Sequence, residues 1–173
     1  MKVDKLHIRS RFKNLENVLI DFDEDHLMTV VVGRNGSGKS NVLEALVAIF
    51  RNLDLGEAPS FSYELHYQLG EESWVKWYDI KVDADPDRGT LAKQYQVSIR
   101  DKHSNETDYK PISFSKVKRD KRTKHAEYLP NFVFAYYSGP SDRLEIYFRK
   151  HRDDYYRELL YSKLELGAHI RSL

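Results

Sequence analysis

The sequence has 173 residues, a length that suits one compact domain with a core of ordinary size. Its formal net charge of +1 gives no overall field that would draw it to a nucleic acid or a membrane, so such a partner must meet a local patch. The lack of cysteine excludes a disulfide scaffold and a thiolate metal site, and the longest apolar run, at 45–50, is too short to cross a bilayer, so we expect a cytoplasmic protein with no membrane partner.

Three short strands are predicted first along the chain. Alternating residues predict a strand at 3–9, and VLIDF predicts a second at 18–22. The stretch MTVVV at 28–32 is apolar throughout, which predicts a third strand that is buried on both faces. Since only a short polar turn precedes it, a parallel crossover has no room, and we expect the second and third strands to pair antiparallel. Asp21 and Asp23 then face solvent and are not catalytic acids.

A glycine-rich stretch, GRNGSGKSN, follows the third strand directly. It meets the pattern G-x-x-x-x-G-K-[ST] of a phosphate-binding (Walker A) loop at Gly33, Gly38, Lys39 and Ser40. Glycines let the backbone wrap closely around a phosphate, and N–H groups at the start of a helix attract an anion. Lys39 would then reach the β- and γ-phosphates of a nucleotide, and Ser40 would ligate Mg²⁺. The predicted nucleotide-binding residues are Gly33, Arg34, Asn35, Gly36, Ser37, Gly38, Lys39, Ser40 and Asn41.

The flanking residues favour this interpretation over an ordinary surface loop rich in glycine and serine. A buried-type strand enters the loop, and NVLEALVAIF at 41–50 is apolar on nearly every side, which predicts a helix inside the domain. Glycine and proline at 55–60 end that helix.

The middle of the chain has a different pattern. Period-two alternation predicts strands at 61–69, 74–82 and 95–99, which we expect to form an antiparallel meander with a last strand at 112–117, followed by a basic loop at 116–125. A buried-type strand is then predicted at 131–137, and helices after it. The fold class is therefore α/β, a P-loop NTPase with an inserted antiparallel β-sheet subdomain. We expect a single lobe built from 1–57, the insert 58–127, and a return strand with helices over 128–173.

Two stretches resemble one group of ATPases. GRNGSGKSNVLEAL at 33–46 is similar to the Walker A region of ABC-type ATPases of the RecF, chromosome-maintenance (SMC) and OLD-nuclease kind, in which Asn35 and Asn41 are typical. LHIRSRFKNLENVLIDFDE at 6–24 resembles the first hairpin of that group. The resemblance implies that Lys13 and Asn14 lie in a turn that touches nucleotide, although a lysine on an exposed turn can equally be a solvated side chain.

The resemblance also implies cofactors and partners. It implies that the chain is the N-terminal lobe of an ABC-type ATPase that binds ATP and Mg²⁺ and forms a homodimer in which two heads sandwich the ATP. The segments at 50–67 and 129–148 look like ATPases found beside restriction or anti-phage systems. That likeness implies a DNA-processing or defence complex, such as one of DNA repair, with DNA and a nuclease or another defence protein as partners.

Several parts of an ABC-type site are not found in the sequence. The family's Gln would follow a strand such as 131–137, where Tyr137, Ser138 and Gly139 stand instead. No LSGGQ-like segment and no apolar strand ending in Asp-Glu is found. Because the acid that activates the attacking water is therefore unknown, we expect this chain alone to bind ATP·Mg²⁺ but to hydrolyse it negligibly.

Other interpretations stay open. The basic run could contact phosphates of DNA or RNA through Lys116, Lys118, Arg119, Lys121, Arg122 and Lys124. A solvated surface loop, interrupted by Asp120, is the alternative that we prefer. The function itself has two rivals, which are a non-catalytic nucleotide-binding interaction module and a P-loop kinase of another class. The long antiparallel insert and Asn35 argue against the kinase.

Overall fold

The computed structural model describes residues 1–22, 29–104, 107–133 and 144–153. The chain divides into two compact units, Met1–Phe134 and Ala135–Leu173. Among the described residues of the second unit, 145–153 are helical. Within the described part of the chain, every helix is too short or too polar to span a bilayer.

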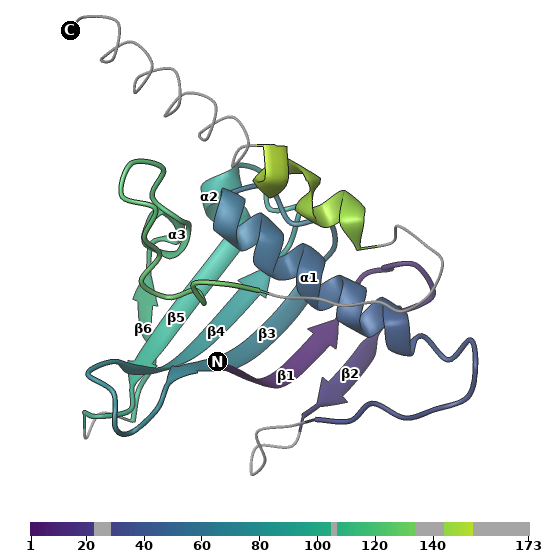
Figure 1. Ribbon diagram of the computed structural model, residues 1–173, viewed down its shortest axis with the longest axis horizontal. Coiled ribbons are helices and arrows are strands. Elements are labelled where there is room, and N and C mark those ends of the chain that lie inside the picture. Colours follow the sequence, from purple (N-terminus) through teal and green to yellow (C-terminus); the bar gives the residue numbers. More distant parts are fainter. Residues whose placement is uncertain (23–28, 105–106, 134–143, 154–173) are drawn as a thin grey trace, which may run out of the picture. The chain divides into compact units, whose positions relative to one another are not determined.

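The first unit is built on one antiparallel sheet of six strands in the order β2-β1-β3-β4-β5-β6 (Figure 1). Together with its three helices it gives an α/β fold. The strands are β1 (Lys2–Ile8), β2 (Val18–Asp21), β3 (Tyr63–Gly70), β4 (Trp77–Ala84), β5 (Tyr95–Asp101) and β6 (Lys110–Ile112). The helices are α1 (Lys39–Leu55), α2 (Leu91–Gln94) and α3 (Phe114–Val117).

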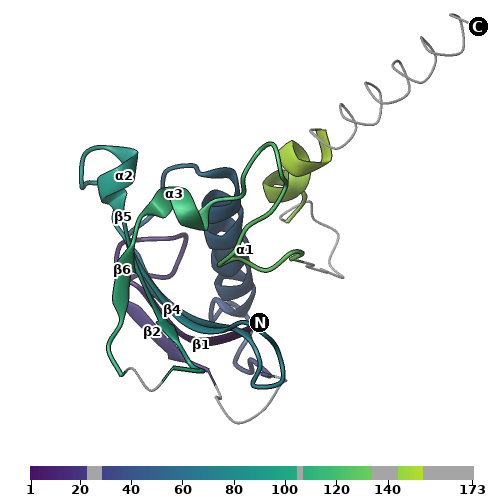
Figure 2. The same cartoon turned by 90° about the vertical axis from the view of Figure 1, so that its left-hand side faces the viewer.

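Helix α1 lies across one face of the sheet, as Figures 1 and 2 both show. Strand residues alternate in burial along β3, so every second side chain points toward α1. The helix contributes Ala45, Ile49 and Leu53, each at most 1% exposed, to the core between the two layers. The core side of the sheet contributes Leu6, Ile8, Tyr63, Leu65, Tyr67, Ile80 and Val82. Burial of this apolar face is the main term that holds the layers together.

The first hairpin and the meander join in one sheet. β1 pairs with β2 as expected for the first hairpin, and it also pairs with β3 on its other side, where Ile8 lies opposite Tyr63. The predicted strands at 61–69, 74–82 and 95–99 are confirmed as β3, β4 and β5, which pair in sequence. The phosphate-loop segment and α1 therefore connect β2 to β3, which lie on opposite sides of β1.

The predicted strand at 28–32 is wrong for its described residues, 29–32. They form no strand, and Val30 and Val32 are 72% and 83% exposed. The predicted pairing with 18–22 is also wrong, because β2 pairs with β1 and lies at the edge of the described sheet. A run of β-branched residues becomes a buried strand only where a neighbouring strand accepts its backbone hydrogen bonds, and the described residues supply none here.

Two more strand predictions fail. At 112–117 the strand ends with Ile112, and α3 follows, because Phe114 and Val117 are buried three residues apart, at the spacing of a helical turn. Phe114 stacks on Tyr95 of β5 with ring centroids 4.1 Å apart. Of the predicted strand at 131–137, residues 131–133 are irregular, and Phe132 is 77% exposed. Residues 134–137 lie outside the described residues, as do Ser138 and Gly139.

The predicted helix at 41–50 is confirmed and is longer at both ends. It begins directly after Gly38 and ends at Gly56, whose φ of 66° lets its N–H bond to the carbonyl oxygen of Asn52. The side chain of Asn52 is buried and donates to the carbonyl oxygen of Ala58, at 3.1 Å. The end of α1 is thus set by the glycine that the sequence pattern indicated.

Candidate functional site

The predicted phosphate loop, residues 33–38, is an exposed turn that leads into α1. The ammonium of Lys39 donates to two carbonyl oxygens of this loop, at 2.6 Å to Gly33 and 2.8 Å to Arg34. The backbone N–H of Ser37 donates to the same Arg34 oxygen at 3.2 Å. Lys39, which the motif assigns to phosphate, therefore lies at the loop. Two neutral carbonyl oxygens accept hydrogen bonds from its ammonium there.

Two glycines of the loop lie close to neighbouring side chains. A Cβ on Gly33 would lie 2.9 Å from Oγ of Ser37. A Cβ on Gly38 would lie 2.8 Å from Cδ2 of Leu15, and the φ of Gly38 is 97°, which other residues rarely adopt. Gly38 is thus favoured by its backbone conformation as well as by its neighbour, as expected for a loop whose backbone wraps an anion.

The first turn of α1 suits an anion. Gly38 at the N-cap has no side chain to satisfy the helix N–H groups, and the first turn has no acidic residue. The N–H groups at the start of a helix and the positive end of its dipole favour a negative ligand such as a phosphate. Ser40 and Asn41 lie in this turn and are half-buried. The residues present therefore fit a nucleotide phosphate with its Mg²⁺, for which Ser40 would be the hydroxyl ligand.

A second segment packs directly against the phosphate loop. The hairpin turn, Phe12–Leu15, is closed by two backbone hydrogen bonds of 2.8 Å and 2.9 Å between its end residues. Nδ2 of Asn14 donates to the carbonyl oxygen of Gly36 at 3.2 Å, and Nδ2 of Asn41 donates to Oδ1 of Asn14 at 2.5 Å. Asn14, assigned to the site from the family resemblance alone, thus links the hairpin turn to the phosphate loop and to α1.

Lys13 lies in the same hairpin turn and pairs with an acid of α1. Its ammonium forms an ion pair with Oε1 of Glu44. The side chain of Glu44 is 1% exposed, whereas that of Lys13 is 37% exposed. Lys13 therefore combines an ion pair to a buried carboxylate with an exposed position on the turn, and its contact with nucleotide stays a prediction.

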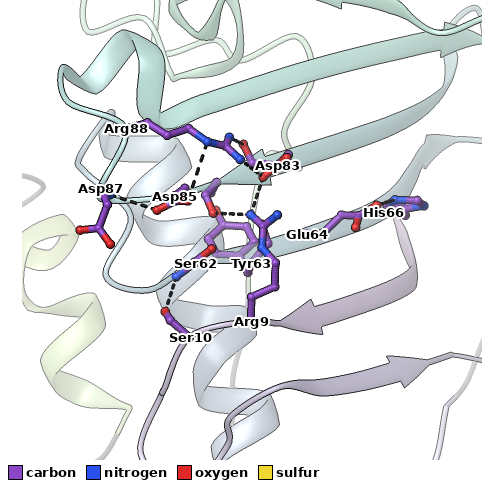
Figure 3. A network of polar contacts seen from close by, with 11 residues as sticks. Arg9, Ser10, Ser62, Tyr63, Glu64, His66, Asp83, Asp85, Asp87 and Arg88 are labelled. Atoms are coloured by element: carbon purple, nitrogen blue, oxygen red, sulfur yellow. Dashed lines mark hydrogen bonds and ion pairs between the residues drawn. The ribbon is translucent and has the colours of Figure 1, made fainter.

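A polar network on the face of the sheet away from α1 fixes the base of the hairpin turn. Figure 3 shows Arg9, just after β1, pointing toward Asp83 of β4, on which Arg88 also converges. The backbone N–H of Arg9 donates to the carbonyl oxygen of Ser62 at 2.9 Å. These contacts fasten the chain three residues before residue 12, where the hairpin turn begins.

The basic run lies at the other end of α1. Nε of Arg119 donates to Oδ1 of Asp54 at 2.7 Å, and its Nη2 donates to the carbonyl oxygen of Pro130 at 3.1 Å. Asp120 accepts from the backbone N–H groups of Arg122 and Thr123, which holds the pKa of its carboxyl below the ordinary value. An α-helix of 17 residues is roughly 25 Å long, so the run is well separated from the phosphate loop.

Among the predicted nucleic-acid contacts, Arg119 is thus used for structure. Lys116, Lys118, Lys121, Arg122 and Lys124 are exposed. Their contact with nucleic acid remains a prediction.

Sequence reasoning missed two side chains that touch the hairpin turn and the loop. Leu15 packs against Gly38, and Glu44 holds Lys13. A signal for Glu44 was present, because an acid inside the apolar run at 41–50 implies a buried carboxylate with a basic partner. The partner itself comes from a turn 31 residues away, which no local pattern can identify.

The family model described as "AAA ATPase domain" matches residues 1–165, which is nearly the whole chain. The chain belongs to the AAA ATPase domain family. This membership agrees with the loop, the helix and the lysine described above, and it supports a nucleotide-binding ATPase function. AAA ATPase domains generally bind ATP with Mg²⁺, the ligands that the donor groups here fit. No curated protein and no solved structure gives a significant match to the chain.

Proposed function

We propose that this chain binds ATP·Mg²⁺ at the phosphate loop and is the N-terminal lobe of an ABC-type ATPase of the RecF, SMC and OLD kind. The observation that carries the proposal is the contact of Asn14 with Gly36 and Asn41. An ordinary surface loop has no need of a second segment that packs on it. A nucleotide site gains from one, because a second segment adds ligand groups and keeps the loop in its binding shape.

Each site residue then has a defined role. Backbone N–H groups of 33–40 surround the β-phosphate, Lys39 exchanges its two carbonyl partners for phosphate oxygens, and Ser40 ligates Mg²⁺. A bound Mg²⁺, for which the Ser40 hydroxyl would be a ligand, would neutralise part of the phosphate charge. Asn14 and Lys13 border the bound nucleotide from the hairpin turn.

At the level of the assembly, we propose that bound ATP closes a dimer of two such lobes and that hydrolysis reopens it. Such a cycle would drive a complex that processes DNA, in repair or in defence against phage, together with a nuclease or another defence protein. The exposed apolar segment 29–32, next to the phosphate loop, is consistent with a further contact partner. A non-catalytic nucleotide-binding module is the second candidate, because the acid that activates water is not identified.

The test of nucleotide binding compares Lys39→Ala with Lys121→Ala, a matched change at an exposed lysine of the basic run. ATP·Mg²⁺ affinity is measured by calorimetric titration of each variant. We expect Lys39→Ala to lose binding by about a hundredfold or more, since two charge-assisted phosphate contacts disappear, and Lys121→Ala to bind as the unaltered chain does. Equal affinity of all three proteins would overturn the proposal.

Two further measurements on the same proteins distinguish the ATPase-lobe proposal from the proposal of a non-catalytic module. Light scattering with and without ATP measures dimerisation, and phosphate release measures turnover. We expect ATP-dependent dimers and negligible turnover by the chain alone. Turnover that Lys39→Ala abolishes would show that the chain supplies its own catalytic acid. ATP binding without dimers at every protein concentration would favour the module.

A further inference from the structure

We propose that Glu44 is a positioning residue of the nucleotide site, because it holds the ammonium of Lys13 beside the phosphate loop. The inference rests on the proposed function, since it needs a phosphate at that loop. It assigns a role to an acid that the Walker A pattern does not include. Glu44 does not touch the nucleotide in this arrangement but acts through Lys13.

The first support is the position of Glu44. It lies four residues after Ser40 on α1, so the two side chains share one face of the helix, one turn apart. Its side chain is 1% exposed, and it pairs with Lys13. A carboxylate so deeply buried needs a cationic partner, so the pair fixes where the ammonium of Lys13 lies.

The second support is the backbone of the hairpin turn. Lys13 has a φ of 56°, in the left-handed region that favours glycine. A long charged side chain is therefore held where a glycine would be less strained, which is common where a side chain has a function. Its neighbour Asn14 is tied to Gly36 and Asn41, so Lys13 cannot move far from the phosphate loop.

The third support is the donor capacity of the ammonium. A lysine ammonium has three N–H donors, and one carboxylate oxygen does not use them all. Glu44 can thus anchor Lys13 while a phosphate oxygen binds the same ammonium. The opposite arrangement, in which Glu44 competes with phosphate for Lys13, predicts that removal of the carboxylate tightens nucleotide binding. The two arrangements differ in the sign of one measurement.

The experiment is a double-mutant cycle on ATP affinity with Glu44→Gln, Lys13→Met and the double variant. We expect Glu44→Gln to weaken ATP·Mg²⁺ binding about tenfold in the unaltered chain, as for loss of one well-placed charged contact. In the Lys13→Met background the same change should have less than about a twofold effect, because no ammonium is left to position. A purely structural role of Glu44 would give equal losses in both backgrounds.

Glu44→Asp serves as the conservative control. It keeps the charge but shortens the reach to Lys13, so we expect an affinity between those of the unaltered chain and Glu44→Gln. Tighter binding by Glu44→Gln, or equal losses in the two backgrounds, overturns the inference. If Glu44 variants do not fold, Lys13→Met alone decides, because unchanged ATP affinity in that variant also overturns it. Loss of binding in Lys39→Ala shows in parallel that the nucleotide site exists, so failure of this inference is distinct from failure of the proposed function.

Discussion

At the scale of single residues, two glycines of the phosphate loop have similar backbones and different surroundings. Gly36 and Gly38 have φ values of 82° and 97°, but only Gly38 faces another segment, the side chain of Leu15. We expect Gly36→Ala to lower the free energy of unfolding by about 1–2 kcal/mol, the cost of a left-handed alanine. Gly38→Ala should lose roughly 1–3 kcal/mol more, because its Cβ overlaps Leu15.

Denaturant unfolding of both alanine variants measures the difference. A third protein, Leu15→Ala combined with Gly38→Ala, is the control, because it opens space for the new methyl group. Adding Gly38→Ala to Leu15→Ala should lower the free energy of unfolding by less than Gly38→Ala does in the unaltered chain. Equal losses for Gly36→Ala and Gly38→Ala would mean that the hairpin turn does not press on the loop.

The site residues show what a local pattern can and cannot predict. The spacing of Gly33, Lys39 and Ser40 predicts the loop because, in the Walker A pattern, each position has a fixed role toward phosphate. Asn14 came only from a family resemblance, and Glu44 was missed. The roles of both residues depend on contacts between distant parts of the chain. Such contacts produce no characteristic spacing of residues in the sequence.

At the scale of elements, the side chain of Arg119 fastens the basic run to the end of α1. Arg119 reaches Asp54, Lys124 and Pro130, and the side chains of Arg119 and Asp54 are 22% and 16% exposed. We expect Arg119→Ala to lower the free energy of unfolding by about 1–3 kcal/mol, because a partly buried carboxylate loses its partner. Lys121→Ala, at an exposed position of the same loop, should change it by less than about 0.5 kcal/mol.

Thermal unfolding of the two variants checks this prediction. Arg119→Lys is a useful comparison, because it keeps the charge but cannot reach three acceptors in one plane. A loss in Lys121→Ala as large as in Arg119→Ala would contradict it. Affinity for DNA, if present, should follow the exposed lysines and fall steeply with salt.

Strand predictions succeeded where alternation was clear and failed where burial depended on a neighbour. β3, β4 and β5 alternate because one face packs on α1 and the other meets solvent. The uniform apolar run at 28–32 carries no such information about which segment lies beside it. The pairing of β1 with β3 was likewise out of reach, because α1 and the phosphate loop separate these strands in the sequence.

At the scale of the whole molecule, the core holds tyrosines that resist ionisation. Burial raises the pKa of the hydroxyl groups of Tyr63, Tyr67 and Tyr95 above the ordinary value, and it raises the pKa of Tyr109 to about 12. The neutral form is thus favoured in the folded state. Its contribution to stability is complete below the unfolded-state pKa of 10 and is lost as the pH rises above it.

We therefore expect the free energy of unfolding to fall steadily between pH 10 and about 12, with the phenolate absorbance of these buried tyrosines appearing only as the chain unfolds. Tyr67→Phe is the matched variant. It loses the hydrogen bond from the Tyr67 hydroxyl to the carbonyl oxygen of Tyr128, 2.6 Å long, and about 1 kcal/mol at neutral pH. As the pH rises, the free energy of unfolding of Tyr67→Phe should then fall by less than that of the unaltered chain. An equal alkaline loss in both proteins would show that Tyr67 does not contribute.

The neighbouring position of β1 and β3 also determines how the molecule can fold. Ile8 meets Tyr63 only when the chain between them, with the phosphate loop and α1, closes into a loop. Closure of a long loop costs entropy before any contact repays it, so this step belongs to the slow part of folding. The hairpin turn and the phosphate loop both lie inside that closed segment. On the ribosome, the segments that we propose to bind nucleotide are therefore made early. They reach their final arrangement only when β3 has been synthesised and pairs with β1.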